Sequence, residues 1–102
     1  MILVTTDHVP GREIAEVIGV VKGYSMYGFA TILSSFTDPM RIASMIEEAR
    51  ENEEIALAEL ETRAEDMEAD AVVGLRFAPS FYENENALKH VAVCYGTAVK
   101  LV

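Results

Sequence analysis

A single long helix, predicted from Pro39 to Met67, is the feature that most constrains the fold of this chain. Asp38 followed by Pro39 predicts its start, because a carboxylate accepts the free N–H groups of a first turn and proline has no N–H to leave unpaired. Apolar residues then recur at helical spacing. This stripe consists of Ile42, Ile46, Ala49, Ala56, Leu57, Leu60, Ala64 and Met67. In a chain of 102 residues, such a helix leaves room for one small sheet and one domain, residues 1–102.

The segments on either side of the helix are typical of strands, with β-branched residues and alternating patterns. We expect strands at Met1–Thr5, Ile14–Gly23, Ala71–Ala78 and Ala87–Val102. The Tyr24–Phe36 segment is ambiguous between strand and loop, and Pro79–Asn86 is predicted to be a polar turn.

A strand–helix–strand crossover makes its two strands parallel, and the last strand is best placed antiparallel, between them or beside them. The predicted fold class is therefore α/β (α+β), in two layers, with one long acidic helix on a small mixed or antiparallel sheet. In the third strand, Val73, Leu75 and Phe77 are expected to share one face. In the last strand, small residues between Ala92 and Ala98 suit close contact with a helix or another sheet.

Hydrophobic residues make up 51% of the chain, which is more than one helix on one face of a sheet can cover. We expect the excess on the Val72–Arg76 and Ala92–Ala98 faces, and hence self-assembly. Glu53 interrupts the apolar stripe, and Ile55 lies on the charged face of the helix. Both residues are either ordinary exposed side chains or contacts with a neighbouring subunit.

The charge distribution argues against two classes of partner. The net charge is −9, and the segment from Met40 to Glu68 holds ten acids and three bases, a local charge of −7. Such a surface repels phosphate, so binding to nucleic acid or to an anionic membrane is not expected. One cysteine, no basic leader and no apolar run of membrane-spanning length predict a cytoplasmic protein.

Few residues offer metal or catalytic chemistry. Soft metals take thiolate and imidazole ligands, and the candidates are Cys94 and His8, brought together by folding, or Cys94 from several subunits around a symmetry axis. His90 and Cys94 are about 13 Å apart along one strand, too far for one ion. Cys94 is otherwise a small buried hydrophobe. No nucleophile elbow or phosphate loop occurs, so an enzyme is not expected.

Three blocks of sequence resemble one family. The first holds Thr5-Thr6, Pro10-Gly11, Ile14, Gly19-Val20-Val21 and Gly23. The second holds Glu54-Ile55-Ala56-Leu57-Ala58-Glu59-Leu60 with Ala69-Asp70-Ala71-Val72-Val73-Gly74, and the third is Tyr95-Gly96-Thr97-Ala98-Val99-Lys100. Together they are similar to the YbjQ-like proteins, a family described as heavy-metal-binding domains. The resemblance implies a dodecin-like β-α-β-β unit and a ring, with a pentamer as the expected assembly. The chain departs from the family at Glu53, where an arginine is usual, and at Glu68, where a glycine is usual.

The expected function is a non-enzymatic, cytoplasmic, homo-oligomeric binding protein that takes a heavy metal or another small ligand at intersubunit sites. The cofactor is a soft metal ion if there is one, and the partner is a second copy of the chain. The alternative is a structural or partner-interaction assembly with no ligand. A second alternative is an enzyme with an intersubunit pocket.

Overall fold

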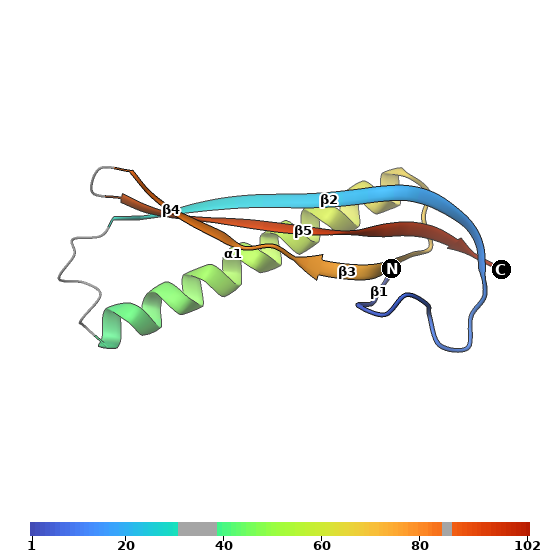
Figure 1. The fold of residues 1–102 in the computed structure, drawn as a ribbon, viewed down its shortest axis with the longest axis horizontal. Helices are drawn as coiled ribbons and strands as arrows, with labels where there is room; N and C mark the ends of the chain where they lie inside the picture. The colour runs from blue at the N-terminus through green and yellow to red at the C-terminus, as the bar shows by residue number, and fades with distance from the viewer. Residues whose placement is uncertain (31–38, 85–86) are drawn as a thin grey trace.

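The computed structural model describes residues 1–30, 39–84 and 87–102, and it confirms the α+β class (Figure 1). Its elements are β1 (Ile2–Leu3), β2 (Ile14–Ala30), α1 (Pro39–Asp66), β3 (Ala71–Phe77), β4 (Ser80–Asn84) and β5 (Ala87–Leu101). The ambiguous segment after Gly23 continues as strand to Ala30. The predicted helix cap at Asp38 and residues 31–36 lie outside the described residues.

The sheet has the order β1-β3-β5-β2, and β4 pairs with β5 beside β3. β5 is antiparallel to both β2 and β3, so the two strands joined through α1 are parallel, as the crossover predicts. The last strand therefore lies between them, and β1 adds a parallel pair at the β3 edge. β2 and β5 pair along their whole lengths, and this long strand pair runs along the length of the molecule in Figure 1.

The prediction of a polar turn at Pro79–Asn86 is wrong for most of that segment. β4 pairs with the start of β5, from Ser80 opposite Val91 to Asn84 opposite Ala87. β3 ends at Phe77, which leaves the edge of β5 beyond it without a partner. The aromatic pair at positions 81 and 82 has high strand propensity, and the chain continues past β3 in the same direction along this edge of β5.

Helix α1 crosses one face of the sheet, behind the strands in Figure 1. Ala56, Leu60 and Ala64 are fully buried against it, four residues apart along the helix. The opposing sheet residues are small, and Ala92, Cys94 and Ala98 of β5 lie in the same core cluster. The small-residue face of β5 is therefore the helix-facing side. Among the described residues, no helix is long and apolar enough to cross a membrane.

A glycine changes which residues of β3 face the helix. Gly74 has a φ of 63°, and the pairing of β3 with β5 shifts register between Val73 and Arg76. Leu75 consequently belongs to the core under the helix, whereas Val73 belongs to a second cluster with Val99. The expectation that Val73 and Leu75 share a face is wrong, because the bulge turns the strand between them.

The second face of the sheet is covered at one end only. Val9, from the segment between β1 and β2, is buried there with Ala71, Val73 and Val99. The remainder of this face, on β2 and β5, has no covering element among the described residues. The excess apolar surface was expected on the Val72–Arg76 and Ala92–Ala98 faces. That expectation is wrong for Val72 and for the Ala92–Ala98 face, because these residues are buried in the core under α1.

The helix ends at a residue with a left-handed backbone. Glu68 has a φ of 62°. Its N–H donates to the Glu65 carbonyl at 2.9 Å, and the Ala69 N–H donates to the Ala64 carbonyl at 3.1 Å. These two bonds form a Schellman cap, in which glycine usually occupies the position of Glu68. The sequence therefore predicted the site of the helix end correctly, and a non-glycine residue adopts the strained conformation there.

The molecule is elongated for its size. Its radius of gyration is 16.8 Å, compared with about 13 Å for a compact domain of this length. Its accessible surface is 6420 Å², compared with about 5700 Å² for a typical monomer of this mass. The chain alone therefore exposes roughly 700 Å² more surface than a protein of its mass usually does.

Candidate functional site

The sulfur of Cys94 is enclosed between β5, β2 and the helix. The residue has no exposed surface, and its Sγ–H donates to the Gly23 carbonyl at 3.7 Å. Burial raises the pKa of the thiol, and the charge of Glu59 acts in the same direction, while the bond to Gly23 opposes them. The neutral thiol is therefore favoured over the thiolate that a soft metal needs.

His8 lies in the segment between β1 and β2 and is open to solvent. Its Nδ1 is 2.8 Å from Asp7 Oδ1. The pKa of the Asp7 carboxyl is lowered by this hydrogen bond and by the charge of the histidine. Both side chains are exposed, with 64% of His8 accessible, so another molecule can reach the imidazole.

The structure does not bring Cys94 and His8 together. Cys94 is in the core under the helix, whereas the residue next to His8, Val9, packs on the opposite face of the sheet. Within residues 1–30, 39–84 and 87–102, no group of three His, Cys, Asp or Glu side chains could hold a metal ion. The described donors of a single chain therefore do not fit a heavy-metal site.

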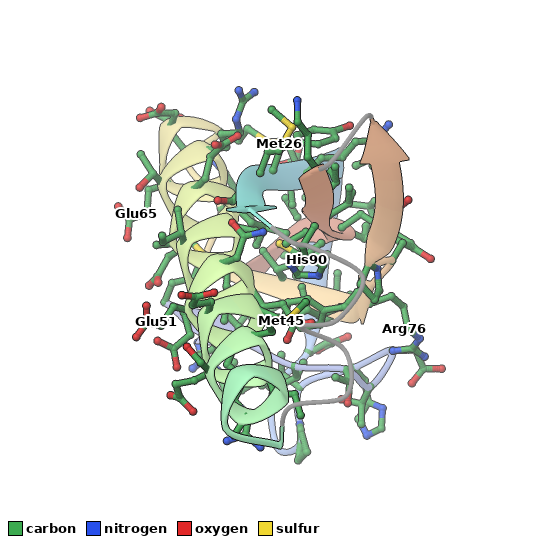
Figure 2. All side chains as sticks on the ribbon, turned by 90° about the vertical axis from the view of Figure 1, so that its left-hand side faces the viewer. Met26, Met45, Glu51, Glu65, Arg76 and His90 are labelled. Carbon is green, nitrogen blue, oxygen red and sulfur yellow. The ribbon has the colours of Figure 1, made fainter. Side chains whose placement is uncertain are left out.

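A buried polar cluster lies under the middle of the helix. Asn52 and His90 are each 1% exposed, and Ser25 is half-buried beside them. The Ser25 hydroxyl donates to Asn52 Oδ1. Asn52 Nδ2 lies 3.0 Å from His90 Nδ1, and it donates to the carbonyl oxygens of His90 at 3.1 Å and Ser25 at 3.3 Å. Figure 2 shows His90 between the helix and the sheet.

Sequence reasoning missed this cluster, although a signal for it exists. Asn52, Ala56, Leu60 and Ala64 are spaced four residues apart, so the asparagine lies on the buried stripe of the helix. A buried amide requires partners, and a strand histidine among small residues is a suitable one. The cluster fixes the position of α1 on the sheet, and its polar groups are bonded to one another.

The face of the sheet opposite α1 is mostly apolar, with Lys22 exposed within it opposite Tyr95. Its apolar members are Val17, Val20, Tyr24 and Met26 of β2 with Val91, Val93 and Tyr95 of β5. Val20 is 67% exposed and Tyr24 46% exposed. We call these seven residues the open face. Monomers seldom expose a continuous apolar surface of this kind unless it is used for binding.

A groove borders the open face at the outer edge of β2. It has a volume of about 290 Å³ and is lined by Val20, Val21, Lys22, Arg63, Asp66 and Met67. The first three residues come from β2, Arg63 and Asp66 come from the last turn of α1, and Met67 directly follows the helix. Arg63 is bonded to Glu59 at 3.1 Å on its own helix.

The outer side of the helix is a solvated acidic surface. In Figure 2, Glu51 and Glu65 point away from the sheet. Ile55 is 59% exposed on this side, and Glu53 is half-buried. Both observations agree with ordinary surface residues within one chain, and contact with a neighbouring subunit stays a prediction.

Known proteins resemble this chain over its whole length. Residues 1–102 match the YbjQ family, described as "Putative heavy-metal-binding". A UPF0145 protein of Fervidobacterium nodosum is 42% identical over 106 residues, covering 99% of this chain and 95% of that protein. A UPF0145 protein of Pseudomonas putida is 37% identical over 109 residues, covering 99% of both chains.

A solved structure shares the fold. It is the crystal structure of a protein of unknown function, from the DUF74 family, of Pediococcus pentosaceus. It superposes with a TM-score of 0.66 at 20% identity and covers 100% of this chain and 98% of that one. The similarity supports one long helix packed on a mixed sheet as the architecture of the chain.

Proposed function

The chain belongs to the YbjQ (UPF0145) family over its whole length, and from this premise we propose that it is a non-enzymatic homo-oligomeric binding protein with its ligand sites between subunits. The family description supplies the ligand class, a heavy metal. The resemblance also supplies the proposed assembly, a closed ring with a pentamer as the expected form.

The open face of the sheet is the observation that carries the assembly. It lies opposite α1, and no helix or strand among the described residues covers it. A standard interface buries about 800 Å² on each partner, and the chain exposes roughly 700 Å² more than is typical of its mass. Contact between copies through the open face would remove this excess.

The metal donors favour a site between subunits over a site within one. Cys94 is enclosed and its neutral thiol is favoured, so it cannot reach a neighbouring chain. His8 is accessible and carries a carboxylate beside it. We therefore propose that a metal at a subunit boundary takes His8 rather than Cys94, with other ligands from the adjacent copy.

Two matched double variants test the assembly. Val20→Lys with Tyr24→Lys places two charges on the open face. Ile46→Lys with Ile55→Lys places the same two charges on the helix. Ile46 was expected on the buried stripe, but it is 51% exposed, and Ile55 is 59% exposed. Native mass spectrometry at micromolar concentration should give a multiple of 11.2 kDa for the wild type and the helix variant. The sheet variant should be a folded monomer by circular dichroism. Dissociation of the helix variant alone would overturn the assignment to the open face.

Metal binding is tested on the same proteins. Each is equilibrated with Zn²⁺, freed of excess ion by gel filtration and analysed for zinc by elemental analysis. The wild type, the helix variant and Cys94→Ala should retain zinc, whereas the sheet variant and His8→Ala should lose it. Retention of zinc by the monomeric sheet variant would contradict a site between subunits.

An assembly without a ligand is the second candidate function. It is favoured by the donor set, since no described cluster of three metal-binding side chains exists in the chain. The zinc experiment separates the two functions. An assembled wild type that elutes free of zinc supports the ligand-free assembly.

A further inference from the structure

β2 presents a long backbone edge that no described strand pairs. It is the terminal strand of the sheet, and β5 is its one strand partner among the described residues, paired from Ile14 to Ala30. Natural edge strands are usually protected by proline, by several charges or by shortness. β2 has 17 residues, no proline, and Glu16 and Lys22 as its only charged residues. An edge of this kind pairs with other chains unless a strand covers it.

The register shows which backbone groups point outward. The Val93 carbonyl in β5 accepts a bond from Ala78, on the β3 side of the sheet. Backbone groups of successive strand residues alternate between the two edges. The next residue, Cys94, therefore faces β2, and its register partner Gly23 faces β5.

Lys22 and Tyr24, which flank Gly23, consequently direct their N–H and C=O groups to the free edge. The side chains of Val20 and Tyr24 belong to the open face, so the free edge continues that face. An added strand would extend the sheet and bring further apolar cover with it.

The groove beside this edge has room for side chains of such a strand. Its volume of about 290 Å³ lies between β2 and the last turns of α1, with Met67 on its helix side. Alternate side chains of an added strand point to opposite faces of the sheet. One set would therefore enter the groove, and the other set would lie along the open face.

We infer that a strand of a second copy of this chain adds to the outer edge of β2 and places its side chains in the groove beside α1. The inference rests on the proposed self-assembly and names the strand through which copies join. A second copy is the occupant that the surface supports, because the chain exposes roughly 700 Å² more than is typical of its mass, close to the ~800 Å² that each partner buries in a standard interface.

A proline at an outward-facing position tests the pairing. Lys22→Pro removes an N–H that points away from β5 and is used by no bond between described residues, whereas Lys22→Ala removes the same side chain and keeps the N–H. Native mass spectrometry should show a monomer for Lys22→Pro and the wild-type assembly for Lys22→Ala. A folded Lys22→Pro that assembles as the wild type does would overturn the inference.

Amide hydrogen exchange on the unmodified protein gives a test that needs no variant. In the assembled protein, the amides of Lys22 and Tyr24 should exchange at least tenfold more slowly than in the monomeric Val20→Lys and Tyr24→Lys double variant. A wild type that assembles while these amides exchange at unprotected rates overturns the inference and leaves the proposed function standing. A wild type that is monomeric overturns the proposed function.

Discussion

A Cβ atom at Gly23 would lie 2.0 Å from the carbonyl oxygen of Ala56, so β2 and α1 touch through their backbones at this point. The same atom would lie 2.7 Å from the Leu60 nitrogen. Cys94 bonds to the Gly23 carbonyl from the neighbouring strand. Close approach at a glycine therefore positions the helix over the two long strands.

Gly23→Ala should lower the free energy of unfolding by about 3 kcal/mol, because the helix must move away from the strand. Urea denaturation followed by circular dichroism measures it. Gly11→Ala is the matched control, since Gly11 has a φ of 74° and nothing within 4 Å of an added Cβ. Gly11→Ala should lower the free energy of unfolding by about 1 kcal/mol, because only backbone strain opposes it. Equal losses of free energy of unfolding in Gly23→Ala and Gly11→Ala would contradict the close contact between β2 and α1 at Gly23.

Asn52→Ala should lower the free energy of unfolding by about 2–3 kcal/mol, because it removes the buried amide that bonds the Ser25 hydroxyl and lies beside the His90 ring. Its neighbour Glu51 is exposed on the outer side of the helix, so Glu51→Ala should stay within about 0.5 kcal/mol of the wild type. Chemical denaturation of both variants gives the comparison. An Asn52→Ala protein as stable as Glu51→Ala would show that the cluster does not hold the helix.

Glu68→Gly should be about 1 kcal/mol more stable than Glu68→Ala, because glycine adopts the left-handed conformation without a Cβ clash. Alanine removes the same carboxylate and keeps the strain, which separates the backbone effect from the charge. Thermal unfolding of the two variants should differ by several degrees. Identical melting temperatures would mean that Glu68 carries no strain.

Because the thiol of Cys94 is buried, we expect the free energy of unfolding to fall at alkaline pH. Burial raises the pKa of the thiol above its ordinary value of 9.0. The folded chain therefore holds the proton more tightly than the unfolded chain does. This stabilisation is fully present below the unfolded pKa, near pH 9, and is lost as pH rises through the raised folded pKa. The stability of the wild type relative to Cys94→Ala, from urea unfolding at pH 7.5 and 10, should fall at pH 10.

An unchanged difference between the wild type and Cys94→Ala at the two pH values would contradict the enclosure of the thiol. Reaction with Ellman's reagent at pH 8 supplies a second measurement. Cys94 should react only after urea unfolds the protein, because the neutral thiol is buried and the reagent needs an accessible thiolate.

Periodicity predicted most of the fold. The stripe from Ala56 to Ala64 and the small residues of β5 correctly indicate two surfaces in contact. The strand–helix–strand order correctly gives β2 and β3 as parallel strands, and the structure places β5 between them, which is one of the two positions predicted. These features depend on local pattern and chirality, which a single sequence carries.

The remaining features depend on partners far apart in the sequence. β4 forms because β5 extends beyond the end of β3, and only the strand lengths reveal this. The left-handed Gly74 moves Leu75 to the helix side, and a regular alternation of strand residues cannot predict it. Asn52 belongs to the buried stripe, but its role becomes clear only when Ser25 and His90 lie beside it.

The mass of the purified wild-type protein in solution tests the central claim most directly. Sedimentation velocity at micromolar concentration should give one assembled species at a multiple of 11.2 kDa, with a five-fold multiple for the proposed ring. The open face and the edge of β2 would then be covered by other copies. A single species of 11.2 kDa at the same concentration would contradict self-assembly.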